Sequence, residues 1–400
     1  MATESTEVGS PLQNTEFHPP RKSLKRRRWL FVLFAVFTGL LVGLVLTEVL
    51  VRLYGLGPPR MISKRQLIPV GQQNSLCYYH CYPSNPHGEF RALPDIASGS
   101  WRLHDYTFEK EPLPLSRLQE TPWCVEYCHS SMGIRDREYS PITPKDKLRL
   151  AVVGDSFVFG EGVAVEQTLP RQLETILGSK YECINAGQVG ANAEQELDIL
   201  NAIVGGADCK RVILVLIPND MPLTPKLAYR QKYINDFILI RDRYLDKAWH
   251  NAGPLGHLRL FDYLTAPGVM RQVRDDTLNW YRDSFSEIHN GQNLAWFQEQ
   301  MNLLAARKDC EVVVVLYPLL EDLDNDYPLR IVHEVMSDMV NRAGLPLLDL
   351  SSTLAGQKSS SLWVHETDHH PNAKAQKLAA SAIADWLVSD HPDFLNSIEN

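Results

Sequence analysis

Beyond residue 148 the chain contains short apolar runs separated by segments with a helical pattern. The apolar runs are LRLAVVGD at 148–155, YECINAG at 181–187, RVILVLIPND at 211–220 and CEVVVVLYP at 310–318. They are rich in β-branched residues and almost without polar positions, which is typical of strands covered on both faces of a sheet. We therefore expect four buried strands.

Amphipathic segments between and after these runs predict helices. Pro170 suits the first turn of a helix whose apolar stripe includes Leu169 and Leu173. Asn372 is a suitable N-cap for a last helix. Because strands that alternate with helices form parallel sheets, we predict an α/β fold with a doubly wound parallel sheet, a three-layer sandwich of the flavodoxin-like kind.

The segment from about 221 to 309 interrupts this alternation between the third and fourth runs. It contains aromatic residues in the stretches LNWYRDSF and LAWFQEQM. We interpret it as an insertion whose helices form a roof over the edge of the sheet.

A different pattern opens the chain, where a basic cluster at 21–28 directly precedes an uncharged apolar run at 29–47. About nineteen residues at ~1.5 Å each span about 28 Å, close to the hydrocarbon core of a bilayer. A buried helix of a soluble core would carry a polar face, and a cleaved signal peptide would have a shorter apolar run followed by small residues. We therefore predict an uncleaved transmembrane anchor, with a cytoplasmic N-terminus and a periplasmic or extracellular remainder.

These patterns divide the chain into four parts. A cytoplasmic basic tail spans 1–28, the transmembrane anchor 29–47 and a cysteine-containing, loop-rich extension 48–145. The α/β domain spans 146–390 and contains the insertion at about 221–309. The start of the tail is polar and has no apolar period, so we expect it to be disordered.

Four of the seven cysteines lie in the extension, with Cys77 and Cys81 in CYYHC and Cys124 and Cys128 in CVEYCH. An exported compartment permits disulfides, and we interpret these four as disulfides that stabilise an irregular segment. A four-thiolate metal site and a haem attachment stay open as alternatives, although the spacing fits neither well. The others lie beside apolar runs and are expected to be buried thiols or one further bridge: Cys183, Cys209 and Cys310.

Composition and charge exclude one class of partner. The hydrophobic content of 44% is sufficient for a globular core. The formal net charge is −8 and the only basic cluster is local, whereas binding to a phosphate backbone needs concentrated positive surface. We therefore expect no nucleic-acid partner.

Polar residues that could take part in a reaction follow the ends of the predicted strands. Ser156 follows the first strand, NAGQVGAN with Gly187 and Gly190 the second, and Asn219 in IPND the third. A further polar stretch, ETDHHPNAKAQ, lies near the end of the chain. The carboxyl ends of parallel strands meet at one edge of a doubly wound sheet, where ligands bind. A serine there is a nucleophile only if a base and a group that orients the base are beside it, and the last stretch contains both residue types.

Together these four stretches resemble the sequence blocks of the SGNH hydrolases, also called GDSL lipases and esterases. The resemblance runs from about 148 to 387 and is interrupted by the insertion. A Gly-Asp-Ser tripeptide alone is common, and Ser156 alone would be read as a turn residue. The resemblance depends on all four blocks in order, each at a strand end, and it implies the SGNH α/β fold.

The resemblance implies a role for each matching residue. Ser156 is expected to be the nucleophile, His370 the general base and Asp368 the group that orients the base. The backbone N–H groups of Ser156 and Gly190 and the side-chain amide of Asn219 are expected to form an oxyanion hole. Gly187 is expected to be structural.

Two features depart from the family pattern. Pro218 stands before Asn219 where the family often has glycine. The usual Asp-x-x-His spacing is shortened to Asp368-x-His370, which makes His369 a second candidate for the base.

The resemblance implies a membrane-anchored serine esterase that hydrolyses acyl esters of a lipid, glycan or small molecule through an acyl-serine intermediate, with no metal or organic cofactor. Two other functions stay open: an O-acyltransferase acting on cell-surface glycans, and a non-catalytic binding protein that retains the fold. The stretch HETDHH also offers metal ligands, with His365 and Glu366 beside the Asp/His block, but a metal site would leave the other three blocks unexplained.

Overall fold

The structure is a computed structural model of the 400-residue chain. It describes residues 22–54, 56, 66–69, 77–81, 124–130, 132–231, 253–365 and 368–396. The chain forms two compact units, Met1–Leu56 and Gly57–Asn400. The N-terminal tail before residue 22 and Glu366 lie outside the described residues.

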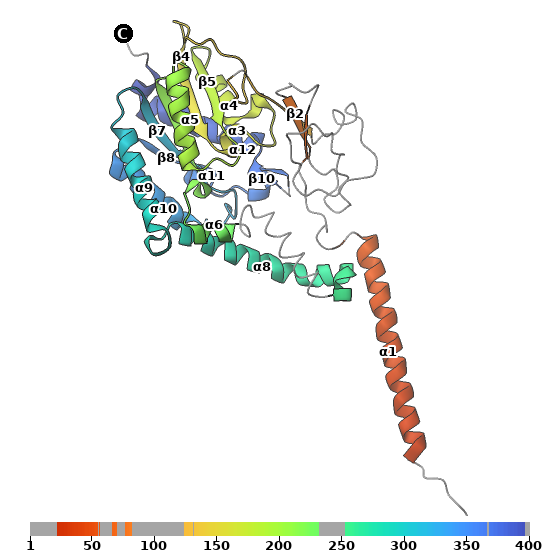
Figure 1. The fold of residues 1–400 in the computed structure, drawn as a ribbon. Coiled ribbons are helices and arrows are strands. Elements are labelled where there is room, and N and C mark those ends of the chain that lie inside the picture. Colours follow the sequence, from red (N-terminus) through yellow and green to blue (C-terminus); the bar gives the residue numbers. More distant parts are fainter. Residues whose placement is uncertain are drawn as a thin grey trace, which may run out of the picture. The chain divides into compact units, whose positions relative to one another are not determined.

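The second unit is built on a five-stranded parallel sheet with the strand order β5-β4-β6-β7-β8 (Figure 1). The chain runs from β4 outward to β5 and then crosses back to β6, so the sheet is doubly wound, as the sequence predicts. The strands are β4 (Leu148–Gly154), β5 (Tyr181–Gly187), β6 (Arg211–Leu216), β7 (Glu311–Leu316) and β8 (Leu347–Asp349).

Alternate residues of each strand enter two different hydrophobic cores, one on each face of the sheet. Ala151 and Val153 belong to the core covered by helices α5, α9 and α10, whereas Leu150 and Val152 belong to the core covered by α4 and α12. Both faces of the sheet are therefore buried away from solvent, which explains why the strand sequences are apolar almost throughout. The helices are α4 (Leu169–Leu177), α5 (Ala193–Gly206), α9 (Glu287–Ala305), α10 (Arg330–Ala343) and α12 (Ala373–Asp390).

The predicted helix ends agree with the structure. Pro170 lies in the first turn of α4, where its missing N–H leaves no hydrogen bond unmade. The side chain of Asn372 accepts hydrogen bonds from the backbone N–H groups of Lys374 and Ala375 at the start of α12. An N-cap of this kind contributes about 1 kcal/mol to helix stability.

The described parts of the segment predicted as an insertion are mainly helical and partly belong to the main layers. It contains α6 (Pro225–Gln231), a 3₁₀ turn (Gly253–His257), α8 (Arg259–Ser284) and α9. Trp280 of α8 and Phe297 of α9 are buried in the same core as the sheet. Helix α9 is thus the crossover from β6 to β7, and the earlier part of the segment reaches the carboxyl edge of the sheet.

A small antiparallel sheet links the described strands of the extension. It has the order β1-β2-β3 and consists of Gln66–Pro69, Cys77–Cys81 and Cys124–Cys128. The register places Cys77 opposite Cys128 and Cys81 opposite Cys124, and Cys128 is disulfide-bonded. This agrees with the disulfide interpretation of the extension. The three later cysteines are free and buried: Cys183, Cys209 and Cys310.

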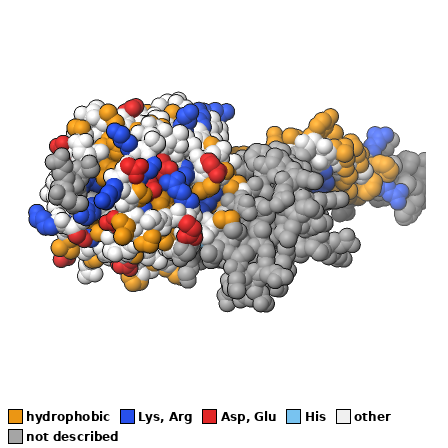
Figure 2. Space-filling model, turned by 90° about the horizontal axis from the view of Figure 1, so that it is seen from above, with side chains coloured by type: hydrophobic (Ala, Val, Ile, Leu, Met, Phe, Trp, Pro, Cys, Tyr) orange, Lys and Arg blue, Asp and Glu red, His pale blue; other side chains and the backbone are white. Residues whose placement is uncertain are grey.

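The first unit contains one long helix, α1 (Lys22–Leu53). Its part from Arg27 to Leu53 contains an 18-residue stretch with a mean hydropathy of 2.6 and is long and apolar enough to cross a membrane, a test that a signal sequence also passes. Figure 2 shows hydrophobic side chains along the visible face of this helix. The hydroxyls of Thr38 and Thr47 donate to the carbonyls four residues earlier, so these polar groups are satisfied within the helix, as a hydrocarbon environment requires.

Candidate active site

Ser156 lies at the carboxyl end of β4, where the chain turns sharply into the short helix α3 (Ser156–Phe159). Asp155 caps this helix, because its Oδ1 accepts a hydrogen bond of 2.8 Å from the backbone N–H of Phe157. Gly187 on β5 permits the turn to pack closely, since a Cβ atom there would lie 2.1 Å from the backbone nitrogen of Phe159. Gly187 is therefore structural, and the serine hydroxyl is held at the edge of the sheet.

His370 and Asp368 are brought to Ser156 by a two-stranded antiparallel sheet. The sheet consists of β9 (Trp363–His365) and β10 (Asp368–Pro371). The Nε2 atom of His370 lies 2.9 Å from the Oγ of Ser156, and its Nδ1 lies 2.5 Å from the Oδ1 of Asp368. Residues two apart on a strand point to the same side, so the shortened Asp-x-His spacing still places the two side chains together.

His369 points elsewhere, as the alternation of side chains along a strand requires. Its ring is stacked on Trp363, with 3.6 Å between ring centroids and 6° between the planes. Its Nδ1 contacts the carboxylate of Glu321. The histidine that reaches Ser156 is therefore His370, and His369 is part of a neighbouring packed cluster.

The two other predicted site residues line the same pocket as Ser156 and His370. Gly190 has a φ of 74°, a conformation that favours glycine. Asn219 belongs to the 3₁₀ turn that follows β6, and its buried Oδ1 has no hydrogen-bond partner within the described part of the chain. The turn is fixed by Asp220, whose Oδ2 accepts a hydrogen bond of 2.5 Å from the backbone N–H of Ile217.

The pocket has a volume of about 510 Å³ and is lined by polar and apolar residues. Ser156, His370 and the carboxylate of Glu161 are among the polar ones. The segment after β6 and helices α6 and α8 contribute the apolar residues Met221, Pro222, Leu223, Ala228 and Tyr281. The segment predicted as an insertion therefore does contribute to the walls of this site.

Three buried carboxyl groups lie near the site: Asp155 directly after β4, Glu196 on α5 and Asp220 in the turn after β6. Burial raises the pKa of Asp155, Glu196 and Asp220 above the usual carboxyl range, and the charges of neighbouring carboxylates raise the pKa of Glu196 and Asp220 further. Glu196 is fully buried, and neither of its side-chain oxygens has a hydrogen-bond partner among the described residues. Such a group is more stable in its neutral form.

Glu196→Gln is expected to make the stability of the protein less sensitive to alkaline pH. Because the folded state raises the pKa of Glu196, the stability that this group contributes is fully present below its unfolded pKa of about 4.3 and is lost as pH rises through the folded value. Glutamine is neutral throughout, so the variant should exceed the wild type in melting temperature by more at pH 9 than at pH 5. An equal difference at both pH values would contradict this expectation.

Three side chains of the site could in principle bind a metal ion, the alternative raised by the sequence. Glu161, Asp368 and His370 offer ligand atoms that lie within 4.8 Å of one another. Both ring nitrogens of His370 already have partners, Asp368 at Nδ1 and Ser156 at Nε2, so a cation here would have to displace the serine hydroxyl. The side chains of His365 and Glu366 lie outside the described residues.

This chain resembles several solved structures at low sequence identity. No family model matches the sequence, and no curated protein matches it. A carbohydrate acetylesterase family member from Sinorhizobium meliloti is 12% identical, with a TM-score of 0.34, and the match covers 61% of this chain and 99% of that one. An aryl esterase from M. smegmatis and a member of the lipolytic protein G-D-S-L family from Veillonella parvula DSM 2008 are each 14% identical, with TM-scores of 0.32, and cover 60% of this chain and 99% of their own.

Proposed function

We propose that this chain is an SGNH-type serine hydrolase that cleaves carboxylic esters through an acyl-serine intermediate. The observation that carries the proposal is the contact of 2.9 Å between Ser156 Oγ and His370 Nε2, with Asp368 on the opposite nitrogen of the ring. The hydroxyl lies in a pocket, where a substrate can reach it. A turn serine with no chemical role would not need this arrangement.

In the proposed reaction the proton of Ser156 passes to Nε2 of His370 while Oγ bonds to the acyl carbon. The bond from this carbon to the alcohol oxygen then breaks, and the alcohol leaves with the proton from Nε2. Water repeats the same sequence on the acyl-serine and releases the acid. Asp368 holds the ring in the tautomer that has its proton on Nδ1 and its lone pair toward the serine.

Stabilisation of the tetrahedral intermediate is assigned to groups on three different strand ends. Gly190 and Asn219 line the pocket beside Ser156, and we propose that their backbone and side-chain N–H groups, with the backbone N–H of Ser156, bind the oxyanion. The place of Asn219 in the lining supports this role, because its side-chain amide carries the N–H donors that an oxyanion needs. Each such donor contributes about 3 kcal/mol to transition-state stabilisation in comparable enzymes.

Substrate and location extend this proposal. The apolar residues that line the pocket fit an uncharged acyl group, whose burial is favourable. We propose that α1 anchors the enzyme in a membrane, with the basic residues before it in the cytoplasm; the disulfide at Cys128 supports an oxidising environment for the rest of the chain. Protease that has access to the outer face of this membrane, as in spheroplasts, should then degrade the α/β domain, and its protection would reverse the proposed orientation.

Labelling with a fluorophosphonate tests the chemistry directly. The detergent-solubilised full-length chain should gain one adduct, on the peptide that contains Ser156, and should hydrolyse a short-chain nitrophenyl ester. The Ser156→Ala variant should gain no adduct and lose hydrolysis. Undiminished ester turnover by this variant would remove the proposed function.

A further inference from the structure

A second carboxylate faces the catalytic side of His370. The Oε2 atom of Glu161 lies 3.1 Å from Nε2 of His370, the same nitrogen that lies 2.9 Å from the hydroxyl of Ser156. The side chains of Glu161 and His370 are only 8% and 11% exposed, so bulk water screens this contact weakly. Nε2 therefore lies between a hydroxyl and a carboxylate, while Nδ1 faces Asp368.

The loop that carries Glu161 is fixed by a buried arginine. Arg135 is 1% exposed, and its guanidinium donates hydrogen bonds to the carbonyls of Phe159, Gly160 and Val163 at 2.9, 2.6 and 2.5 Å. These carbonyls flank Glu161 on both sides. A charged group that donates to three carbonyls of one short loop restricts the positions that the loop can take.

A tyrosine of the extension, Tyr127, also contacts the loop that carries Glu161. The phenol oxygen of Tyr127 on β3 accepts a hydrogen bond of 2.6 Å from the backbone N–H of Gly162, next to Glu161. The Tyr127 ring packs edge-on against Phe159 and lies 4.1 Å from the guanidinium of Arg135. Burial raises the pKa of Tyr127 well above its usual value, so this residue stays neutral.

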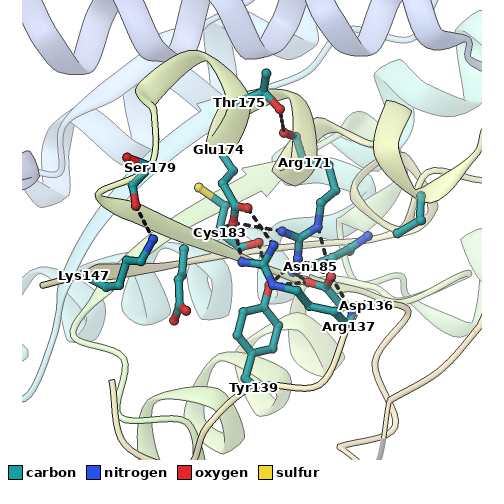
Figure 3. A network of polar contacts seen from close by, with 12 residues as sticks. Asp136, Arg137, Tyr139, Lys147, Arg171, Glu174, Thr175, Ser179, Cys183 and Asn185 are labelled. Atoms are coloured by element: carbon teal, nitrogen blue, oxygen red, sulfur yellow. Dashed lines mark hydrogen bonds and ion pairs between the residues drawn. The ribbon is translucent and has the colours of Figure 1, made fainter. Parts of the chain in front are cut away.

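Arg135 itself is anchored through the residue that follows it. Figure 3 shows Asp136 near Arg171 and Asn185, in a polar network between the segment before β4 and the main domain. Its carboxylate accepts hydrogen bonds of 2.8 Å from the backbone N–H of Asn185 and from the hydroxyl of Tyr139, and it forms an ion pair with Arg171 on α4. The network ties the segment of Arg135 and Asp136 to β5 and α4. Because Arg135 binds the loop of Glu161, this loop is connected to the central sheet.

We propose that Glu161 is a further catalytic residue, whose carboxylate stabilises the imidazolium of His370 from the side of Ser156. The inference rests on the proposed function of Ser156 and His370. When Nε2 takes the serine proton, the new N–H lies between Oγ and the carboxylate of Glu161. The proton later leaves from Nε2 to the departing alcohol oxygen, and Glu161 keeps its charge throughout. Asp368 and Glu161 thus act on opposite nitrogens of one ring.

Other charged or titratable groups around this ring also set its charge. Asp155 contacts the Ser156 hydroxyl on the sheet side, Asp368 faces the ring from β10, and Tyr127 and Arg135 lie behind Glu161. Because an adjacent negative charge favours imidazolium, removal of the Glu161 charge should make the ring titrate at lower pH. The pH dependence of His370 is therefore the readout that separates this role from a purely structural one.

The test compares Glu161→Gln with Glu166→Gln, which removes an equal charge from an exposed position in the same region of the chain. We expect Glu161→Gln to lower kcat about tenfold with little change in KM and to move the acidic limb of the pH–rate profile down by about one unit. Glu166→Gln should leave both unchanged. An unmoved acidic limb in Glu161→Gln, or an effect confined to KM, would overturn the proposal.

Titration of the ring by NMR makes the result independent of turnover. In detergent-solubilised chain carrying Ser156→Ala and labelled with ¹⁵N-histidine, the added change Glu161→Gln should shift the His370 titration to lower pH by about one unit. No shift would overturn the inference about Glu161, whereas activity retained by Ser156→Ala would overturn the proposed function instead. Melting temperatures of the variants show whether each one is folded.

Discussion

His370→Ala is expected to lower kcat for ester hydrolysis by about 10⁴- to 10⁶-fold, which is the range for loss of the base from a serine triad. The reason is geometric, because Nε2 of His370 is the basic nitrogen that lies 2.9 Å from Ser156 Oγ. Without it the serine proton has no acceptor in the site, and the alcohol has no proton donor. KM should change little, since the ring contributes mainly to the transition state.

His369→Ala is the matched control for this variant. The two histidines are adjacent, but His369 is stacked on Trp363 and contacts Glu321. Its loss should reduce the melting temperature and leave kcat within about tenfold of the wild type. Equal losses of kcat in the two variants would contradict the proposal that His370, and not His369, is the general base.

Asp368→Asn is expected to lower kcat by about 10⁴-fold while the fold is kept. Asp368 is 2% exposed, and its Oδ1 accepts from both the ring and the backbone N–H of His370. An amide that turns its NH₂ toward Nδ1 favours the other tautomer, which puts a proton on the nitrogen that must accept one. The loss should therefore appear in kcat across the whole pH profile.

A second Asp–His pair in the same domain provides the control. Asp349 lies 2.9 Å from Nδ1 of His333, at the C-terminal end of β8. Neither residue lines the pocket, so Asp349→Asn should destabilise the protein without a comparable loss of kcat. If both aspartate variants lost activity in proportion to their loss of melting temperature, the effect of Asp368 would be structural and its proposed role wrong.

The central sheet is largely predictable from the sequence because its strands are buried on both faces. Apolar runs at β4, β5, β6 and β7 carry that signal directly. The edge strand β8 does not, since Leu347–Asp349 has three half-buried residues and no periodicity to detect. Helix α9 is hard to place for a different reason. Phe297 is buried against the sheet, but an aromatic residue in the sequence does not show whether its helix covers the sheet or projects from it.

The candidate site is predictable only in part, for a similar reason. Strand ends and the family resemblance point to Ser156 and to the last Asp/His stretch, but the choice between His369 and His370 depends on the register of the β9–β10 sheet. Glu161 follows Ser156 by five residues, and no motif in the sequence marks it. Its direction is decided by Arg135 and Tyr127, which are distant in the sequence, so no local pattern reveals it.

The pocket is lined by parts of the chain that are far apart in the sequence, and this has a practical consequence. Ser156 lies just after β4 and His370 on β10, whereas Met221, Leu223 and Tyr281 belong to the stretch between β6 and β7. Exchange of these three residues would change the room for a bound molecule without removing a group that contacts Ser156 or His370. Met221 and Tyr281 are also part of the hydrophobic core, so the half-buried Leu223 is the position where the pocket can be reshaped at the lowest cost in stability.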